Sequence, residues 1–226
     1  MKSIIGKSSY RKSRFHDEKG NLISLKYIFS HMIPALISYI ISQFGFRPIL
    51  PWIPYSAINF LNKIPNKENL CVLEYGSGMS TIWLANNFKN IYSVEDYKPW
   101  YSKVLTLINK LRIINIDYNF ISTKEDYINF CSKFNILFDL IIIDGSYRSE
   151  CIKTSLKYLR PGGYLYLDDS DKNSINSNET DMRLCENILR SLSSNDECIL
   201  EFTDFSPCQF FVKQGMVYIK PTSNLD

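Results

Sequence analysis

From residue 70 onward, short apolar runs alternate with longer amphipathic stretches, and this alternation constrains the fold more than any other feature. The apolar runs, each of strand length, are 70–74, 91–95, 116–121, 137–144 and 163–168. The stretches with a helical period are 80–88, 97–112, 124–133 and 149–159. Strand then helix, repeated with short connections, predicts a parallel sheet covered by helices on both faces and joined by right-handed crossovers.

The pattern changes after residue 196, where two strand-like runs, 197–203 and 208–220, flank Pro207. Two adjacent runs joined by a turn predict an antiparallel hairpin that closes one edge of the sheet. The predicted fold class is therefore α/β. It is a Rossmann-like, doubly wound, mostly parallel sheet with a C-terminal antiparallel hairpin, preceded by an N-terminal helical head.

The first fifty residues differ from the rest of the chain in charge. They carry eight lysines and arginines against two acidic residues, Asp17 and Glu18, whereas the whole chain has a net charge of +3. The remainder is therefore slightly acidic, and we predict no nucleic-acid partner. We expect the basic stretch before Asp17 to be a solvated tail.

An uncharged run, residues 27–46, is as long as a membrane span. His31, Pro34, Ser38 and Ser42 recur in it every three to four residues, so a helix here would have a narrow polar stripe. We favour a helix packed on the main domain. Contact of residues 1–46 with a membrane surface, and a true span, stay open as alternatives.

Three prolines, Pro48, Pro51 and Pro54, end this head, because their fixed φ and missing N–H forbid a regular helix. A helical period resumes directly after them. We therefore divide the chain into residues 1–55, a basic tail with a helical cap and connector, and residues 56–226, the ligand-binding domain.

The positions of the cysteines and histidines argue against a zinc site and a histidine-based active site. The six cysteines are scattered, without the spacing of a zinc site, and we expect a reduced, cytoplasmic protein. The two histidines, His16 and His31, both lie in the head. A histidine-based catalytic triad is therefore not expected.

Ligands of such sheets bind outside the carboxyl ends of the strands. The first predicted strand runs into Glu74-Tyr75-Gly76-Ser77-Gly78-Met79-Ser80-Thr81, a glycine loop before a helix, which favours a ligand near the backbone amides. Glu95-Asp96 ends the second strand, nineteen residues after Gly76. An acidic residue at this separation accepts hydrogen bonds from ribose hydroxyls, so a nucleoside ligand is predicted. A tight turn without a ligand is the alternative.

The stretches VLEYGSGMSTIWLA, YSVED, FDLIIIDGSYR and LRPGGYLYLDDSD resemble, in order, the motifs of class I S-adenosylmethionine-dependent methyltransferases. RPILPWIPYSAINFL resembles a Pro/Trp segment that precedes the glycine loop in a bacterial group of these enzymes. The resemblance covers about residues 47–220. It implies that 56–226 is an S-adenosylmethionine-binding domain. The implied cofactor contacts are Glu74, Tyr75, Gly76, Ser77, Gly78, Ser80, Thr81, Glu95, Asp96 and Asp144.

One departure from the three-glycine loop of dinucleotide sites is that Ser80 and Thr81 stand where the third glycine would be. A nucleoside sulfonium has no pyrophosphate to hold, so it does not need this glycine. Glu74 would repel a pyrophosphate, which argues against NAD.

Carboxylates end the fourth and fifth predicted strands, at Asp144 and at Asp168-Asp169. If these strands are neighbours, the three carboxylates face one cleft, and we take Asp144 and Asp168 as catalytic candidates. Asp144, Asp168 and Asp169 could also hold Mg²⁺, in a layout similar to catechol-type O-methyltransferases. Tyr147-Arg148 departs from that family's basic residue. A carboxylate base without metal and a structural role stay open.

The predicted function is S-adenosylmethionine-dependent methylation, by O-methylation of a small-molecule or sugar hydroxyl. An aminopropyltransferase-like enzyme on a similar scaffold is one alternative. A non-catalytic nucleoside-binding or membrane-associated protein is another.

Overall fold

The structure is a computed structural model and describes residues 11–172, 177–192 and 198–222. Within these residues, seven strands form one sheet in the order β3-β2-β1-β4-β5-β7-β6. The strands are β1 (Cys71–Tyr75), β2 (Asn90–Glu95), β3 (Ile116–Phe120), β4 (Phe138–Ile143), β5 (Leu159–Leu167), β6 (Ile199–Phe205) and β7 (Val212–Ile219). The first five pair in parallel, and β7 pairs antiparallel with both β5 and β6. The predicted parallel sheet with a C-terminal hairpin is confirmed.

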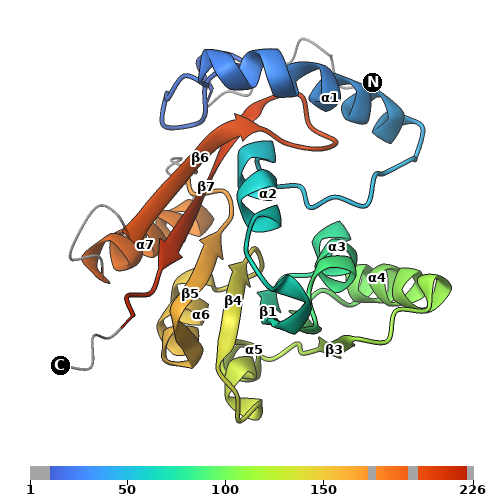
Figure 1. The fold of residues 1–226 in the computed structure, drawn as a ribbon, viewed down its shortest axis with the longest axis vertical. Coiled ribbons are helices and arrows are strands. Elements are labelled where there is room, and N and C mark those ends of the chain that lie inside the picture. Colours follow the sequence, from blue (N-terminus) through green and yellow to red (C-terminus); the bar gives the residue numbers. More distant parts are fainter. Residues whose placement is uncertain (1–10, 173–176, 193–197, 223–226) are drawn as a thin grey trace.

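Helices cover both faces of the sheet (Figure 1). They are α1 (Leu25–Gln43), α2 (Tyr55–Asn62), α3 (Met79–Asn87), α4 (Lys98–Leu111), α5 (Lys124–Ile128), α6 (Arg148–Ser155) and α7 (Ser177–Leu192). The pleat of β1 sends Val72 into a core with residues of α2 and α3, and Leu73 into a core with residues of α5, α6 and α7. Helix α4 packs on α3 through Val104 and Ile108.

The absence of polar residues from Leu140 to Ile143 follows from this arrangement. Leu140 and Ile142 pack on one face of the sheet, and Ile141 and Ile143 on the other. All four are at most 4% exposed. The central strand is buried on both sides, as the sequence predicts.

Two parts of this domain differ from the sequence expectation. Strand β5 begins at Leu159 rather than at residue 163, with an irregular pairing to β4 between Phe138 and Leu140. Helix α7 was not predicted. Its buried Met182, Cys185 and Leu189 recur every three to four residues, which is the signal that could have identified it.

Residues 11–16, the described part of the basic stretch before Asp17, do not form the expected solvated tail. The backbone N–H of Val212 donates to the Arg14 oxygen at 3.0 Å, and Arg11 Nε donates to the Val212 oxygen at 3.0 Å. Asp17 is fully buried. Backbone pairing with β7 therefore holds this described part of the head against the sheet, whereas residues 1–10 lie outside the described residues.

Helix α1 lies across the end of the β6–β7 hairpin (Figure 1). Ala35 packs with Phe205 and Val212 of the hairpin, and His31 Nδ1 lies 2.7 Å from Asp204 Oδ2. The expected polar stripe thus faces the domain in part, through His31 and the buried Ser38.

The opposite face of α1 is uncovered. The exposed apolar side chains on and around it are Leu22, Leu25, Phe29, Ile33, Ile37, Ile40, Ile41, Phe44 and Phe46. Among the described residues, α1 is the one helix long and apolar enough to cross a membrane, and 11% of its most apolar window is buried. A helix in the core of a soluble protein would instead be mostly buried.

Candidate active site

The loops after β1 and β4 touch at the point where the strand order reverses. Gly76 has φ +87°, and a Cβ added to it would lie 2.5 Å from the Gly145 Cα. A Cβ on Gly145 would lie 2.0 Å from the hydroxyl oxygen of Tyr127. Both glycines are therefore needed for the two loops to approach, and the N–H of Asp144 donates to the Tyr75 oxygen at 2.9 Å across the junction.

Gly78 has a different environment. Its φ of 174° is extended backbone that any residue adopts, and the nearest atoms to an added Cβ are 3.8 and 3.9 Å away. Nothing inside the protein requires glycine at this position. A Cβ would instead fill space beside Trp100 at the start of α3, where helix amides are available to a ligand. This open backbone fits the predicted nucleoside cofactor.

Glu74 organises the loop from below. Its Oε2 accepts hydrogen bonds from the hydroxyls of Thr81 and Ser93, each at 2.6 Å, and Thr81 Oγ1 accepts the N–H of Gly78 at 2.9 Å. Glu74 and Thr81 are fully buried, and Glu74 Oε1 has no hydrogen-bond partner. Burial raises the pKa of Glu74 to about 7. These two predicted cofactor residues therefore order the glycine loop from within the core.

Glu95 ties the glycine loop to the end of β2. Its Oε2 accepts from the Ser77 N–H at 3.1 Å and the Ser77 hydroxyl at 2.9 Å, and its Oε1 accepts from the N–H groups of Asp96 and Tyr97. The carboxylate thus has four donors from the protein. Ribose hydroxyls could bind it by replacing the Ser77 hydroxyl, the one side-chain donor among them, which also lies 2.7 Å from the Tyr118 hydroxyl.

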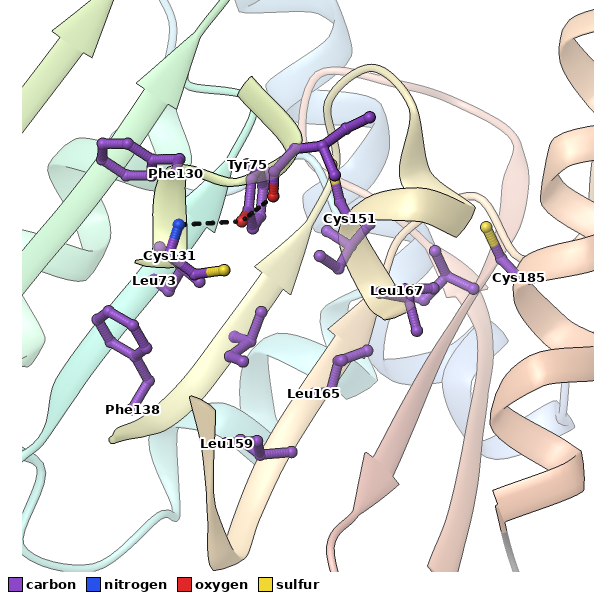
Figure 2. Packing of buried hydrophobic residues seen from close by; sticks show 14 of the residues in the cluster. Leu73, Tyr75, Phe130, Cys131, Phe138, Cys151, Leu159, Leu165, Leu167 and Cys185 are labelled. Atoms are coloured by element: carbon purple, nitrogen blue, oxygen red, sulfur yellow. Dashed lines mark hydrogen bonds between the residues drawn. The ribbon is translucent and has the colours of Figure 1, made fainter. Parts of the chain in front are cut away.

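The Tyr75 side chain lies in the core. It is fully buried, and its hydroxyl donates to the Ile128 oxygen at 3.1 Å and accepts the N–H of Cys131 at 3.4 Å. Figure 2 shows the ring among the apolar residues of the core. Because alternate residues of a strand face opposite sides, Tyr75 points away from the ligand edge, and only its backbone can contact a cofactor. Ser80 and Asp96 are half-buried at that edge.

Two tryptophans connect the glycine loop to the head. Trp100 Nε1 donates to the Ser77 oxygen at 2.7 Å, and its ring centroid lies 6.5 Å from that of Trp52. The Arg47 guanidinium lies over the Trp52 ring. A hollow beside this ring is lined by Ser42, Gln43, Arg47, Trp52, Cys208 and Gln209. The Pro/Trp connector therefore borders both the loop and a polar hollow.

The three predicted carboxylates converge. Strands β4 and β5 are neighbours, and one oxygen from each of Asp144, Asp168 and Asp169 lies within 4.8 Å of the others. Asp168 is buried, whereas the Asp144 side chain is 34% exposed. Partial burial, together with the charge of Asp168, raises the pKa of Asp144 above its usual value. Asp144 is thus the most exposed member of the cluster, ahead of Asp169 with a 27% exposed side chain.

Lys213, which the sequence analysis missed, lies among these carboxylates. Its Nζ is 2.5 Å from Asp168 Oδ2, 2.8 Å from Asp169 Oδ1 and 3.1 Å from the Trp52 oxygen. Burial acts to lower the pKa of Lys213, but Asp168 and Asp169 raise it above the usual value. The signal was a lysine inside the apolar run of the last predicted strand, where an unpaired charge would be costly.

Arg148 holds the loops after β4 and β5 together. Its Nη2 donates to Asp144 Oδ1 at 3.0 Å, its Nε to the Gly145 oxygen at 2.9 Å and its Nη1 to the Asp168 oxygen at 2.7 Å. These bonds occupy the guanidinium within the protein. Arg148 and Asp144 also form an ion pair, at 3.0 Å.

A divalent ion does not fit this cluster as it is folded. Lys213 bonds Asp168 and Asp169, and the other oxygen of Asp168 accepts the Tyr166 hydroxyl at 2.9 Å. Mg²⁺ would have to displace a buried ammonium from two carboxylates before it could gain oxygen ligands. No step of the reaction is therefore assigned to a metal.

No protein-family model and no curated protein matches the chain. Solved structures do match its fold. An O-methyltransferase from Bacillus cereus in complex with SAH has a TM-score of 0.62 at 15% identity, over 86% of this chain and 96% of that chain. The O-methyltransferase TomG from Streptomyces achromogenes, in complex with SAM, has a TM-score of 0.60 at 14% identity, over 84% and 89%. An rRNA methylase from Streptococcus thermophilus has a TM-score of 0.53 at 16% identity, over 73% and 95%. The chain therefore has the fold of the class I S-adenosylmethionine-dependent methyltransferases.

Proposed function

We propose that this protein is an S-adenosylmethionine-dependent methyltransferase that acts on a hydroxyl group of a small molecule or sugar. The observation that carries the proposal is the position of Asp144. It is a reachable carboxylate with a raised pKa, and its backbone adjoins Gly76 at the switch point of a methyltransferase fold. Cofactor loop and candidate base thus meet at one edge of the sheet.

The glycine loop holds the cofactor. The backbone around Gly78 and the first amides of α3 form the contact surface, while Glu74 and Thr81 keep this loop in shape from within. Glu95 accepts the ribose hydroxyls. S-adenosylmethionine, when bound, supplies a methyl group on a positively charged sulfur.

Asp144 receives the proton of the acceptor. A hydroxyl is a poor nucleophile until its proton is removed, and a carboxylate with a raised pKa is a better general base than an ordinary one. The hydroxyl proton would pass to Asp144, and the methyl group would come from S-adenosylmethionine, which would leave as S-adenosylhomocysteine. Arg148 fixes the orientation of this carboxylate through its bond to Oδ1 and through both neighbouring loops.

The surroundings support a small polar acceptor. The hollow beside Trp52 presents Ser42, Gln43 and Gln209, which can bind hydroxyls. A polyamine, the acceptor of an aminopropyltransferase, would need carboxylates without counter-charges, whereas Lys213 and Arg148 already pair with this cluster. The acidic balance of the chain beyond residue 50 disfavours RNA.

Calorimetric titration with S-adenosylmethionine and S-adenosylhomocysteine tests the proposal. Wild type should bind both, and Glu95→Ala should bind about tenfold more weakly or worse, because it removes charged hydrogen-bond acceptors. Asp117→Ala, which removes an exposed carboxylate from the neighbouring β3, is the matched control and should bind normally. No binding by the folded wild type would refute the proposal. Methyl transfer to RNA but not to hydroxylated small molecules would refute the acceptor class.

An anionic membrane surface is the second candidate partner, and it is favoured by the uncovered apolar face of α1. No acidic residue occurs between Glu18 and Glu68, whereas this stretch contains five basic residues, Lys26 and Arg47 among them. Basic residues at both ends of an exposed apolar helix match the chemistry of anionic lipid. In a flotation assay, wild type should rise with phosphatidylserine vesicles, and the variant Phe29→Ser/Ile33→Ser should not. Equal behaviour of the two proteins would refute this role.

A cytoplasmic location is also proposed. All six cysteines are free, and Cys131, Cys151 and Cys185 are buried in the core. Free cysteines are typical of proteins from reducing compartments such as the cytoplasm. Fractionation of cells that express the tagged chain checks the location.

A further inference from the structure

We infer that Lys213 takes the place of a divalent cation in the carboxylate cluster, so that the site works with an ammonium group of its own chain instead of a bound metal ion. The consequence for catalysis rests on the proposed function. The cation position itself rests on the geometry of the cluster.

Three carboxylates within 4.8 Å of one another need a positive charge between them, because like charges at this distance repel. A metal ion supplies that charge where oxygen ligands converge and are free to coordinate. Here Lys213 Nζ lies between Asp168 and Asp169, with a 5% exposed side chain. The position that favours a cation is filled by the protein itself.

All three N–H donors of the Lys213 ammonium already have acceptors within the protein. Its three N–H groups match three acceptors, namely Asp168 Oδ2, Asp169 Oδ1 and the Trp52 oxygen. Lys213 therefore cannot donate to a substrate without breaking one of these bonds. We assign it as a positioning residue that holds the carboxylates of Asp168 and Asp169 in place, rather than as a catalytic residue.

The C-terminal hairpin delivers this charge. Strand β7 pairs with β5 up to Leu167 and Met216, and it continues past the end of β5 so that Lys213 lies beside Asp168 and Asp169. Asp169 has φ +54°, a turn that brings its carboxylate to the ammonium, and the N–H of Ser170 donates to the Gln214 oxygen at 2.9 Å. The extension of β7 and the turn at Asp169 therefore both bring Lys213 close to Asp168 and Asp169.

The tethered ammonium also explains how Asp144 stays available. Asp168 and Asp169 bond to Lys213, whereas Asp144 pairs with Arg148 and keeps a partly exposed side chain. A metal ion bridging all three would draw Asp144 into its coordination shell. With Lys213 in that position, an acceptor hydroxyl can approach Asp144 directly.

Binding of Mn²⁺, followed by electron paramagnetic resonance, tests the inference without reference to activity. The signal of free Mn²⁺ should be unchanged by wild type and by Lys213→Arg, which keeps the positive charge. Lys213→Met removes the charge and the terminal Nζ but keeps most of the apolar stem of the side chain, so it should bind one Mn²⁺ per chain. The double variant Lys213→Met/Asp168→Asn should lose that site again.

Thermal unfolding gives a second readout. Mg²⁺ should raise the melting temperature of Lys213→Met and leave that of wild type unchanged, because a ligand stabilises only the protein that binds it. Stoichiometric Mn²⁺ binding by wild type that is lost in Asp168→Asn would overturn the inference, and this measurement does not depend on the folding of any lysine variant. A folded Lys213→Met that binds no Mn²⁺ would also overturn it. Failure of the proposed function would appear separately, as absent binding of S-adenosylmethionine.

Discussion

The buried carboxyl of Glu74 makes the stability of this protein depend on pH in a calculable way. Its pKa is raised from 4.5 to about 7, first by burial and further by the neighbouring Glu95, while the hydroxyls of Ser93 and Thr81, which donate to it, oppose the rise. The folded protein therefore keeps a proton on Glu74 that the unfolded chain releases. The contribution of Glu74 to the free energy of unfolding is therefore fully present below pH 4.5 and is lost as the pH rises toward 7. A difference of this size between folded and unfolded pKa corresponds to about 3 kcal/mol.

Glu74→Gln should remove this dependence, because the amide is neutral at every pH and has the shape of the protonated acid. The variant should be about as stable as wild type below pH 4.5 and more stable by up to about 3 kcal/mol above pH 7. Urea unfolding across this range measures the difference, from which the titrations of all other groups cancel. Glu68→Gln, which changes an exposed carboxyl in the same way, should show no such trend. A constant difference between Glu74→Gln and wild type across the range would refute the reasoning.

Three further changes have expected outcomes. Gly145→Ala should lower the free energy of unfolding by about 1–3 kcal/mol, because its Cβ would lie 2.0 Å from the Tyr127 hydroxyl. In thermal unfolding, added Tyr127→Phe should recover part of this loss, and no recovery would contradict the clash. Asp204→Ala removes the acceptor of His31, at a cost of about 1–3 kcal/mol, and should speed proteolysis within α1 as followed by mass spectrometry. Unchanged cleavage would show that apolar packing alone holds the helix. Thr81→Val removes the hydroxyl that accepts the Gly78 N–H, so it should weaken binding of S-adenosylmethionine although Thr81 itself is buried. Thr81→Ser keeps the hydroxyl and should bind normally, and calorimetry compares the two variants.

The predictable parts of this protein are those in which local pattern and environment agree. The apolar run of β4 had to be a central strand, since four successive apolar residues need cover on both faces. The glycine loop and the acid after the second strand were recognisable because their spacing follows from one strand-helix-strand unit. Helix α7 was missed although its apolar spacing is regular, and β5 began earlier than its glycines suggested.

The candidate site was predictable in its carboxylates but not in its cations. Asp144 and Asp168 end adjacent strands, so sheet topology brings them together wherever the fold forms. Lys213 comes from the far end of the chain, and only the antiparallel pairing of β7 with β5 brings it to them. Trp52 likewise reaches the cluster through a connector that has no regular structure.

By itself, the sequence determined the doubly wound sheet, the edge at which a ligand is predicted to bind and the carboxylates at that edge, because hydrophobic period and the succession of strands and helices are properties of the chain itself. Only the tertiary structure decided what those groups do. It placed Tyr75 in the core, tied Glu95 to its own loop, and put Lys213 among the carboxylates that were candidate metal ligands. The physical reason is that burial and pairing set the charge and reach of a side chain, and both depend on residues distant in sequence.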